Sequence, residues 1–288
     1  MVVEKGINVL SFNGKYHSRP SPPLNPCFVK ILFSSFIGIK HNEDGGVMFI
    51  QSYYDETILE IRSSSFYKCS TDATSGAIYF CGQESLIEKS CFTHCFASSH
   101  YHSIRITLEP PKKYLNHLNE SSVSYCSENN IGVNNIALIF GQVHSTSLNG
   151  SKNMVKSQSS NILMMSSRGT DAIWQLSNCI ETKGHYSNYF NGQKQLFIRF
   201  CNFIKVLDND GRYGLIRTAS PTKISDCVFF DNQARLISAI RTKVQVFSSS
   251  IDQEKMEYDG VEFDDSVRFS VYQKQQISLV FQNIVCVK

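Results

Sequence analysis

The sequence predicts an all-β protein built as one parallel β-helix, a solenoid of about nine or ten coils. The first observation behind this prediction is composition: Ile, Val, Phe and Tyr total 78 of the 288 residues, whereas Ala, Leu and Met total 31. β-Branched and aromatic side chains favour strands, while Ala, Leu and Met favour helices. The second observation is that short apolar segments recur at a fixed offset along the chain.

The apolar segments begin at Cys27 and are separated by Gly, Asn, Asp and Ser, which favour turns. Most are four to six residues long, which suits strands and is too short for an ordinary helix. No stretch keeps the apolar spacing of an amphipathic helix over three turns. In order, the segments are 28–33, 47–50, 58–61, 77–80, 104–108, 136–140, 162–165, 196–200, 215–216, 236–240 and 244–247.

Equivalent residues recur 26 positions apart. Cys69 and Cys95 end two similar segments, Ser-Ser-Phe-Tyr-Lys-Cys and Ser-Cys-Phe-Thr-His-Cys, and the same offset separates Cys201 from Cys227. A period in the twenties, with two or three short strands in each unit, is typical of one coil of a parallel β-helix. Cys is small and apolar, so it fits a narrow stacked interior. At about 4.8 Å per coil, the rod would be about 45 Å long.

A β-sandwich is the alternative, because it also contains many short strands. Sandwiches depend on hairpins, whose strongest two-residue signals are Asn-Gly and Asp-Gly. The chain has three Asp-Gly pairs, at 44–45, 210–211 and 259–260, and Asn191-Gly192 is the one candidate Asn-Gly hairpin between alternating strands. The scarcity of these signals favours the β-helix.

The two ends of the chain are expected to differ from the coils. Residues 1–26 are predicted to form an irregular lead-in or cap, because four of the seven prolines fall between Pro20 and Pro26 and prevent regular strand pairing there. The parallel β-helix is expected over residues 27–257. Residues 258–288 are expected to form a last coil or capping strands, since a solenoid exposes its apolar interior unless its ends are covered.

Charge and composition exclude several classes of protein. The net charge is +3 without a dense run of Lys or Arg, which argues against nucleic acid as a partner. No window of 18 uncharged apolar residues predicts a membrane span, and no signal peptide is recognised at the N-terminus. The ten cysteines are expected to be mostly reduced core thiols, with disulfides as the alternative.

Several short motifs resemble the repeats of the polymorphic outer-membrane proteins. Gly45-Gly-Val-Met48 and Ser75-Gly-Ala-Ile78 are similar to the Gly-Gly-Ala-Ile element of that family, and Phe229-Phe-Asp-Asn232 matches its Phe-x-x-Asn element. Phe66-Tyr-Lys-Cys69 and Phe92-Thr-His-Cys95 are versions of the second element that end in Cys. Similar repeats occur in large surface-protein families of parasitic protists. The resemblance covers roughly residues 45–250 and implies a right-handed parallel β-helix with a surface or adhesion role.

Right-handed β-helices include polysaccharide lyases and hydrolases, so carboxylates are the first candidates for chemistry. The Asn-Thr-Asp, Gly-His-Gly and Arg-Ile-Lys motifs of the hydrolases are absent, as are the Gly-x-Ser-x-Gly and phosphate-loop motifs, and the Asp264-Asp265 pair stands without the other hydrolase motifs. Asp208 and Asp210, followed by Arg212, form the best acidic fragment. A solvated turn is the favoured interpretation and a cation site the alternative. No catalytic residue and no cofactor is assigned from the sequence.

A second cluster contains potential zinc ligands. Cys91, His94 and Cys95 are followed closely by His100 and His102. On a strand, Cys91 and Cys95 share one face while His94 points to the other. A tetrahedral site would therefore use Cys95, His100 and His102 after a turn. The favoured interpretation is core cysteines beside exposed histidines.

The function that this sequence favours is non-enzymatic: a β-helical repeat protein that offers an elongated surface for binding or adhesion. A protein or a glycan along a lateral face is the expected kind of partner, and any exposed members of the 34 aromatic residues are candidates for stacking on sugars. The alternatives are a carbohydrate-active enzyme on the same scaffold, either a polysaccharide lyase or a glycoside hydrolase, and a fragment of a larger surface protein.

Overall fold

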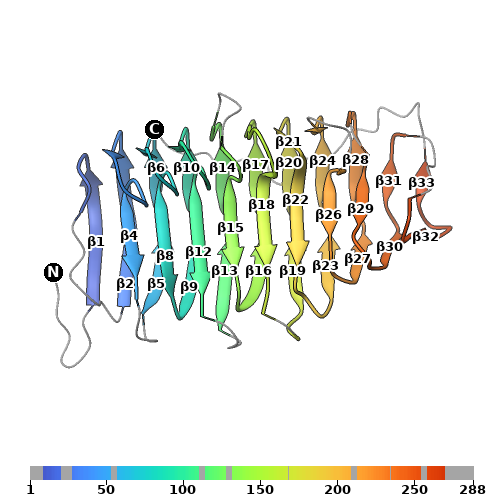
Figure 1. Cartoon of the computed structure of the whole chain (residues 1–288), viewed down its shortest axis with the longest axis horizontal. Coiled ribbons are helices and arrows are strands. Elements are labelled where there is room, and N and C mark those ends of the chain that lie inside the picture. Colours follow the sequence, from blue (N-terminus) through green and yellow to red (C-terminus); the bar gives the residue numbers. More distant parts are fainter. Residues whose placement is uncertain are drawn as a thin grey trace.

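The computed structural model describes residues 9–20, 28–52, 57–109, 114–127, 132–167, 169–208, 213–233, 235–253 and 258–269. These residues form a parallel β-solenoid of about eight turns and contain no helix (Figure 1). Every ladder between successive turns is parallel, and the turns follow one another along the long axis in sequence order. The all-β solenoid that the sequence predicts is therefore confirmed.

One broad sheet of the solenoid is formed by pairs of strands that meet at a corner. The first strand of each pair belongs to the series β1 (Val9–Tyr16), β2 (Phe28–Ile37), β5 (Ile58–Arg62), β9 (Glu84–Glu88), β13 (Leu115–Asn119), β16 (Gln142–Thr146), β19 (Ala172–Gln175), β23 (Leu196–Arg199), β27 (Thr222–Ser225), β30 (Val244–Phe247) and β32 (Val261–Phe263). The second belongs to the series β6 (Ser65–Tyr67), β10 (Cys91–Thr93), β14 (Ser122–Ser124), β17 (Asn149–Ser151), β20 (Asn178–Ile180), β24 (Asn202–Ile204), β28 (Val228–Phe230), β31 (Ser250–Ile251) and β33 (Arg268–Phe269).

The second broad sheet has eight strands. These are β4 (Met48–Gln51), β8 (Ile78–Gly82), β12 (Ile104–Leu108), β15 (Ile136–Ile139), β18 (Ser159–Met165), β22 (Tyr186–Asn191), β26 (Ile216–Thr218) and β29 (Ile237–Ala239). Two small sheets lie at the turns between the broad ones: β3 (Lys40–His41), β7 (Ser70–Thr71) and β11 (Phe96–Ala97) form one, and β21 (Lys183–Gly184) and β25 (Leu207–Asp208) form the other.

The core lies between the two broad sheets and is built from columns of equivalent residues. Phe36, Phe66 and Phe92 occupy one position on successive turns, and their rings stack with centroids 4.9 and 4.6 Å apart. Phe203 and Phe229 continue the column further along, 4.7 Å apart. Offset ring stacking adds to the burial of apolar area, so each ring stabilises the register of its neighbours.

Five of the cysteines fall into two different interior columns. Cys69, Cys95 and Cys126 occupy one position, where each thiol lies within 3.5 to 3.8 Å of a main-chain carbonyl of the preceding turn. Asn232 occupies the equivalent position, and its Nδ2 donates to Phe203 O at 2.9 Å. The Cys-ended and Asn-ended motifs of the sequence thus share one role, which is to bridge consecutive turns.

Cys201 and Cys227 belong instead to a column of serines. Ser34, Ser64 and Ser90 occupy it in the first turns, where the hydroxyl of Ser64 accepts from Ser34 N at 3.1 Å. Seven described cysteines are free thiols. Cys91 differs from the expected core thiol, because it is bonded in a disulfide.

The predicted number of nine or ten coils is slightly higher than the observed number of about eight turns, and the turns differ in length. The equivalent residues Ser34 and Ser64 are 30 positions apart, Ser64 and Ser90 are 26 apart, and Ser90 and Ser121 are 31 apart. Added residues enter at the loops between strands without disturbing the stacked ladders.

The ends of the solenoid refine the expected boundaries. The lead-in over residues 1–26 is not irregular throughout, because β1 pairs with β2 in parallel and forms the first rung. Its prolines follow β1, and β2 begins after the last of them. At the other end, β32 and β33 pair with β30 and β31 as the last described rung. Val271 and the apolar segment 277–281 lie outside the described residues.

Candidate binding face

The eight-stranded sheet presents a flat outer surface because alternate residues of its strands point in opposite directions. Ile104, Ile136 and Ile162 are paired on successive strands and fully buried in the core. The residues that follow them point outward and form the series Arg105, Ala137, Leu163, Tyr189 and Arg217. We name this surface the Arg–Tyr face; it consists of that series with Ile139, Met165, Tyr79, Tyr101, Tyr186 and Tyr213.

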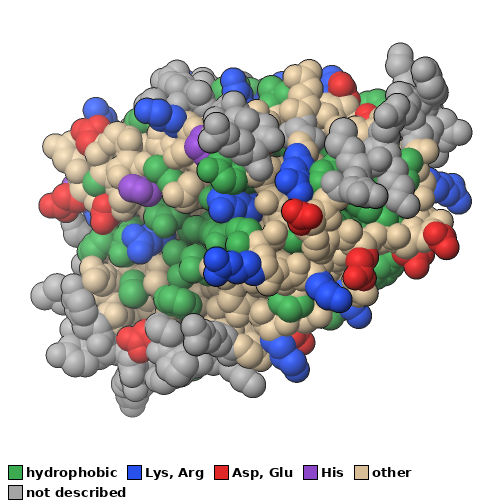
Figure 2. All heavy atoms as spheres, turned by 45° about the vertical axis from the view of Figure 1, so that its right-hand side comes forward, with side chains coloured by type: hydrophobic (Ala, Val, Ile, Leu, Met, Phe, Trp, Pro, Cys, Tyr) green, Lys and Arg blue, Asp and Glu red, His purple; other side chains and the backbone are tan. Residues whose placement is uncertain are grey.

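The middle of the Arg–Tyr face is apolar. Ala137, Ile139 and Leu163 form a hydrophobic cluster that is separate from the solenoid core, and Met165 and Tyr189 pack against it. On the side of the solenoid seen in the space-filling view, hydrophobic side chains gather in a band among Lys and Arg side chains (Figure 2). Ala137, Ile139 and Leu163 are only 0 %, 9 % and 6 % exposed, so the middle of this face is buried.

Arg105 borders this cluster at one end. Its guanidinium carbon lies 5.0 Å from the centroid of the Tyr79 ring and 5.2 Å from that of Tyr101, distances at which a cation is attracted to a ring face. Its Nε is buried and makes no hydrogen bond with a described residue. The two tyrosines therefore hold the guanidinium in place, and its Nε–H has no acceptor among the described residues.

Arg217 borders the cluster at the other end and repeats the arrangement. Its guanidinium carbon lies 4.6 Å from the ring centroid of Tyr213, 5.4 Å from that of Tyr186 and 5.6 Å from that of Tyr189. The Nε is again buried without a hydrogen-bond partner among the described residues. Burial raises the pKa of Tyr186 to about 12, although the neighbouring Arg217 cation favours the phenolate. Tyr186 is therefore a neutral phenol at pH 7.

The charges of this sheet are unbalanced. Its eight strands contain two arginines and no Asp, Glu or Lys. Neither arginine forms an ion pair with a described residue. On the other broad sheet, by contrast, Arg62 pairs with Glu60 at 2.5 Å and with Glu88 at 3.1 Å. The carboxylate nearest in sequence to Arg105 is Glu109, which follows the end of β12.

The ladder fixes the separation of the two arginines. Arg105 pairs with Ala137, and the pairing continues through Leu163 and Tyr189 to Arg217, which makes four steps. At about 4.8 Å per step, the two Cα atoms lie roughly 19 Å apart. Since both arginines lie on paired strands, the backbone holds this separation rigidly.

The acidic fragment that the sequence singled out has a structural role at its first residue. The Asp208 carboxylate accepts from the main-chain N–H of Tyr213 and of Gly214, each at 3.3 Å. This is the use of Asp that a turn favours. Asp210 and Arg212 lie outside the described residues.

The candidate zinc ligands point to different places. Cys95 is fully buried in the core column, and desolvation raises the pKa of its thiol well above the ordinary value. His102 is also buried, and its Nδ1 accepts from Ala97 N at 3.2 Å. His100 Nδ1 lies 2.6 Å from Ser99 Oγ. Within the described part of the chain, no group of three or more His, Cys, Asp or Glu side chains is placed to hold a metal ion.

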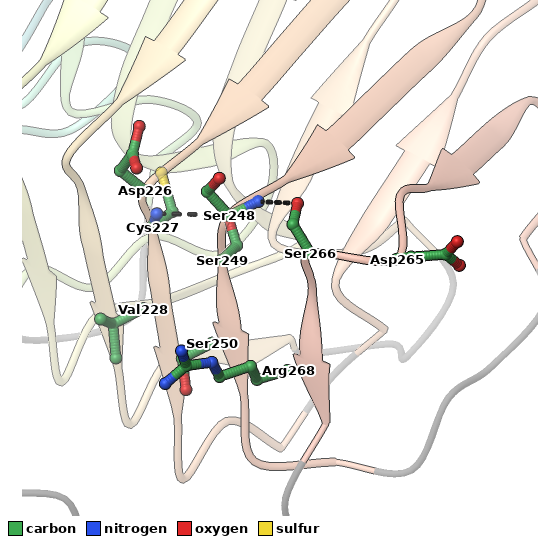
Figure 3. A pocket seen from close by; sticks show the side chains of 9 residues that line it. All are labelled: Asp226, Cys227, Val228, Ser248, Ser249, Ser250, Asp265, Ser266 and Arg268. Atoms are coloured by element: carbon green, nitrogen blue, oxygen red, sulfur yellow. Dashed lines mark hydrogen bonds between the residues drawn. The ribbon is translucent and has the colours of Figure 1, made fainter.

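A hollow near the C-terminal rungs has a volume of about 630 Å³ (Figure 3). It is lined by serines together with Asp226, Asp265 and Arg268. Ser248 N donates to Ser266 Oγ at 2.8 Å across it. The charged groups do not converge, because the Asp265 side chain points away from the other two (Figure 3). This hollow therefore offers a weaker site than the Arg–Tyr face.

Comparison with protein-family models, with curated proteins and with solved structures finds no match for this chain. The described residues also contain no helix able to cross a membrane.

Sequence reasoning did not single out Arg105 or Arg217. The available signal was a lone arginine inside an apolar strand, in Ile104-Arg-Ile106 and again in Ile216-Arg-Thr218. Of the two tyrosines that surround Arg105, Tyr79 lies 26 residues before it and Tyr101 lies in the loop just before its own strand. Only the stacking of turns brings these three side chains together.

Proposed function

We propose that this protein is a non-enzymatic binding protein and that the two half-buried arginines at the ends of the Arg–Tyr face bind an anionic partner. The observation that carries the proposal is the pair of arginines, each held by tyrosine rings and each lacking an ion pair among the described residues, on a sheet whose strands contain no carboxylate. Buried or half-buried cations are usually paired, so an unpaired set of guanidinium donors favours an anionic ligand.

The scaffold suits this role because it is rigid before binding. Arg105 and Arg217 lie on strands paired on both sides, and their side chains are confined by aromatic rings. Binding of a ligand therefore costs little conformational entropy of these protein side chains, and more of the interaction free energy appears as affinity. The planar guanidinium also matches two oxygens of a carboxylate or a sulfate.

The resemblance of the repeats to polymorphic outer-membrane proteins and to protist surface proteins supports the same kind of role, because such repeats form extended adhesion surfaces. A carbohydrate-active enzyme on this scaffold would instead release products from its ligand, and that difference can be measured. The two functions therefore predict different outcomes in one experiment.

The experiment compares the wild type with the double variant Arg105→Gln/Arg217→Gln on a glycan array and in an assay for unsaturated uronates and reducing ends. Arg199→Gln is the matched control, because Arg199 lies on β23 of the other broad sheet with its guanidinium 4.7 Å from the Phe197 ring centroid. We expect binding by the wild type and the control, loss of binding by the double variant, and no product release. Binding that survives in the double variant would refute the assigned face, and product release would establish an enzyme.

A further inference from the structure

We infer that a second binding site lies on the other broad sheet, in a groove that docks a short apolar segment of a partner protein carrying a basic side chain. The groove crosses the outer surface of β2, β5, β9 and β13 and has a volume of about 300 Å³. We name it the Glu84 groove; it is defined by Phe28, Ile58, Glu84, Leu86 and Leu115. It is separate from the two arginines of the Arg–Tyr face, which lie on the eight-stranded sheet.

The ladder places the side chains of the groove in regular rows. Phe28, Ile58 and Glu84 are paired on successive strands, and Leu115 continues this row on β13. Leu86 belongs to the neighbouring row, two residues further along β9. Three steps of about 4.8 Å make the first row roughly 14 Å long, and the second row lies about 7 Å from it. The groove is therefore as long as a few side chains of a bound segment.

The walls of the groove are apolar and accessible. Leu115 is 42 % exposed, and Phe28, Ile58 and Leu86 are half-buried. In this respect the Glu84 groove differs from the middle of the Arg–Tyr face, which is buried. A concave apolar surface with a few polar groups has the usual character of a binding site. Its volume is at the lower end of the range for ligand pockets, so it suits a short segment and not a folded domain.

The charges of the groove favour a cationic partner. Strands β2, β5, β9 and β13 contain three glutamates against one lysine and one arginine. The arginine, Arg62, is already paired with two of the glutamates, at 2.5 and 3.1 Å, and the lysine lies over an aromatic ring of its own strand. The third glutamate, Glu84, lies between Ile58 and Leu115 in its row, and its carboxylate makes no ion pair or hydrogen bond with a described residue. Half-buried carboxylates are usually paired, so Glu84 favours a Lys or Arg side chain of the partner.

The same charges argue against three other occupants. In a two-fold dimer through this groove the same patch would meet its own copy, so carboxylate would face carboxylate, which is unfavourable. Anionic membrane surfaces attract basic patches and not acidic ones. Nucleic acids are held by Lys and Arg contacts to phosphate, and the excess of glutamates here opposes such contacts. A basic segment of a partner protein is the occupant that remains.

The segment would be held through its side chains. Strands β5 and β9 each pair on both sides, so the segment cannot be added to the sheet as a further strand. Its apolar side chains would pack on Ile58 and Leu115, on either side of Glu84, while its basic side chain reached the carboxylate. His117 also lines the groove, and burial lowers the pKa of its imidazole. The ring is therefore mostly neutral at pH 7 and does not repel a cation.

The test selects ligands for the full chain from a phage-displayed library of random decapeptides. Counter-selection uses the double variant Glu84→Gln/Leu115→Ser, which removes the carboxylate and one apolar wall. The enriched peptides are synthesised, and their dissociation constants are measured by fluorescence anisotropy for the wild type and each single variant, all checked by circular dichroism. Glu262→Gln is the charge control, because Glu262 is exposed on β32 of the same sheet. Phe200→Ser is the apolar control, because Phe200 is 52 % exposed and lies outside the groove.

We expect the enriched peptides to combine Lys or Arg with a large apolar residue a few positions away. Glu84→Gln should weaken their binding about tenfold, as expected for the loss of a charge-assisted hydrogen bond. Leu115→Ser should weaken it about threefold to tenfold, because less apolar area is buried. Added salt should weaken binding to the wild type more than binding to Glu84→Gln. Both controls, and the variant Arg105→Gln/Arg217→Gln, should bind the peptides like the wild type.

Other outcomes would overturn the assignment of the groove. If no peptide is enriched, or if the enriched peptides lack a basic residue, a basic segment is not the partner. If Glu262→Gln or Phe200→Ser weakens binding as much as Glu84→Gln, the peptides do not bind in the groove. A wild-type dimer in sedimentation velocity that Leu115→Ser dissociates would give the groove to a second copy instead. The arginine sites of the proposed function stand or fall independently of these results.

Discussion

Replacing Phe66 by Ala tests whether the aromatic column holds neighbouring turns of the solenoid in register. The Phe66 ring is 1 % exposed and lies between two other rings, with centroids 4.9 Å from Phe36 and 4.6 Å from Phe92. The interplanar angles are 11° and 2°, so both contacts are parallel stacks. The change removes both stacks and leaves a cavity in the core.

The expected loss in the free energy of unfolding is about 4 kcal/mol. Phe→Ala changes in cores cost about 3–5 kcal/mol, which includes the cavity, and each aromatic pair contributes about 0.5–1.5 kcal/mol beyond area burial. Strands above and below are fixed by their own ladders, so the site can collapse only partly. Phe33→Ala is the matched control: Phe33 is 69 % exposed, and its loss should change stability by less than about 0.5 kcal/mol.

Urea unfolding followed by circular dichroism measures the free energies, and hydrogen exchange locates the effect. Because each turn contacts mainly its neighbours, amide protection should fall most in β6 and β10 and least in β24 and β28. The reasoning is refuted if Phe66→Ala costs less than about 1 kcal/mol or no more than Phe33→Ala. A uniform loss of protection along the rod would refute the local role of the column.

Three further predictions concern other parts of the fold. Gly76→Ala should lower the melting temperature more than any exposed Gly→Ala change, because a Cβ at this position would lie 2.2 Å from the main-chain oxygen of His102. An unchanged melting temperature would contradict the close packing of turns. The folded-state pKa values of His117 and His144 lie below the ordinary 6.5, chiefly because burial disfavours the imidazolium. The unfolded chain therefore binds more protons than the folded chain, and the free energy of unfolding should fall as pH drops below about 6.5. Thermal melts from pH 7.5 to 5 should show this decline in the wild type and a smaller one in His117→Gln/His144→Gln; equal declines would exclude the pair as its source. Cys81 is the only half-buried thiol among the seven described free cysteines, so peptide mapping after brief alkylation should find it modified first, and earlier labelling of a core thiol would contradict the stacked interior.

Much of the fold could be predicted because each turn of a solenoid places the same kinds of residue at equivalent positions, so the pattern recurs along the sequence. The 26-residue offset between Cys69 and Cys95 corresponds directly to stacked positions, since their segments pair residue by residue in β6 and β10. The corners were harder to predict. Ser63, Lys89 and Glu120 adopt φ values of 49, 50 and 45°, a conformation that usually selects Gly or Asn. Main-chain bonds between turns support these corners, so no turn motif was required.

The sequence by itself determined the all-β class, the parallel solenoid and the inward apolar positions, because burial imposes a pattern that repeats with each turn. Only the tertiary structure decided the number of turns, the placement of five cysteines in two interior columns, and the Arg–Tyr face. Arg105 and Arg217 are 112 positions apart in the printed sequence, and nothing local links them. Their shared row depends on the register of four successive ladders, and register is set by the lengths of the intervening loops, which follow no repeat.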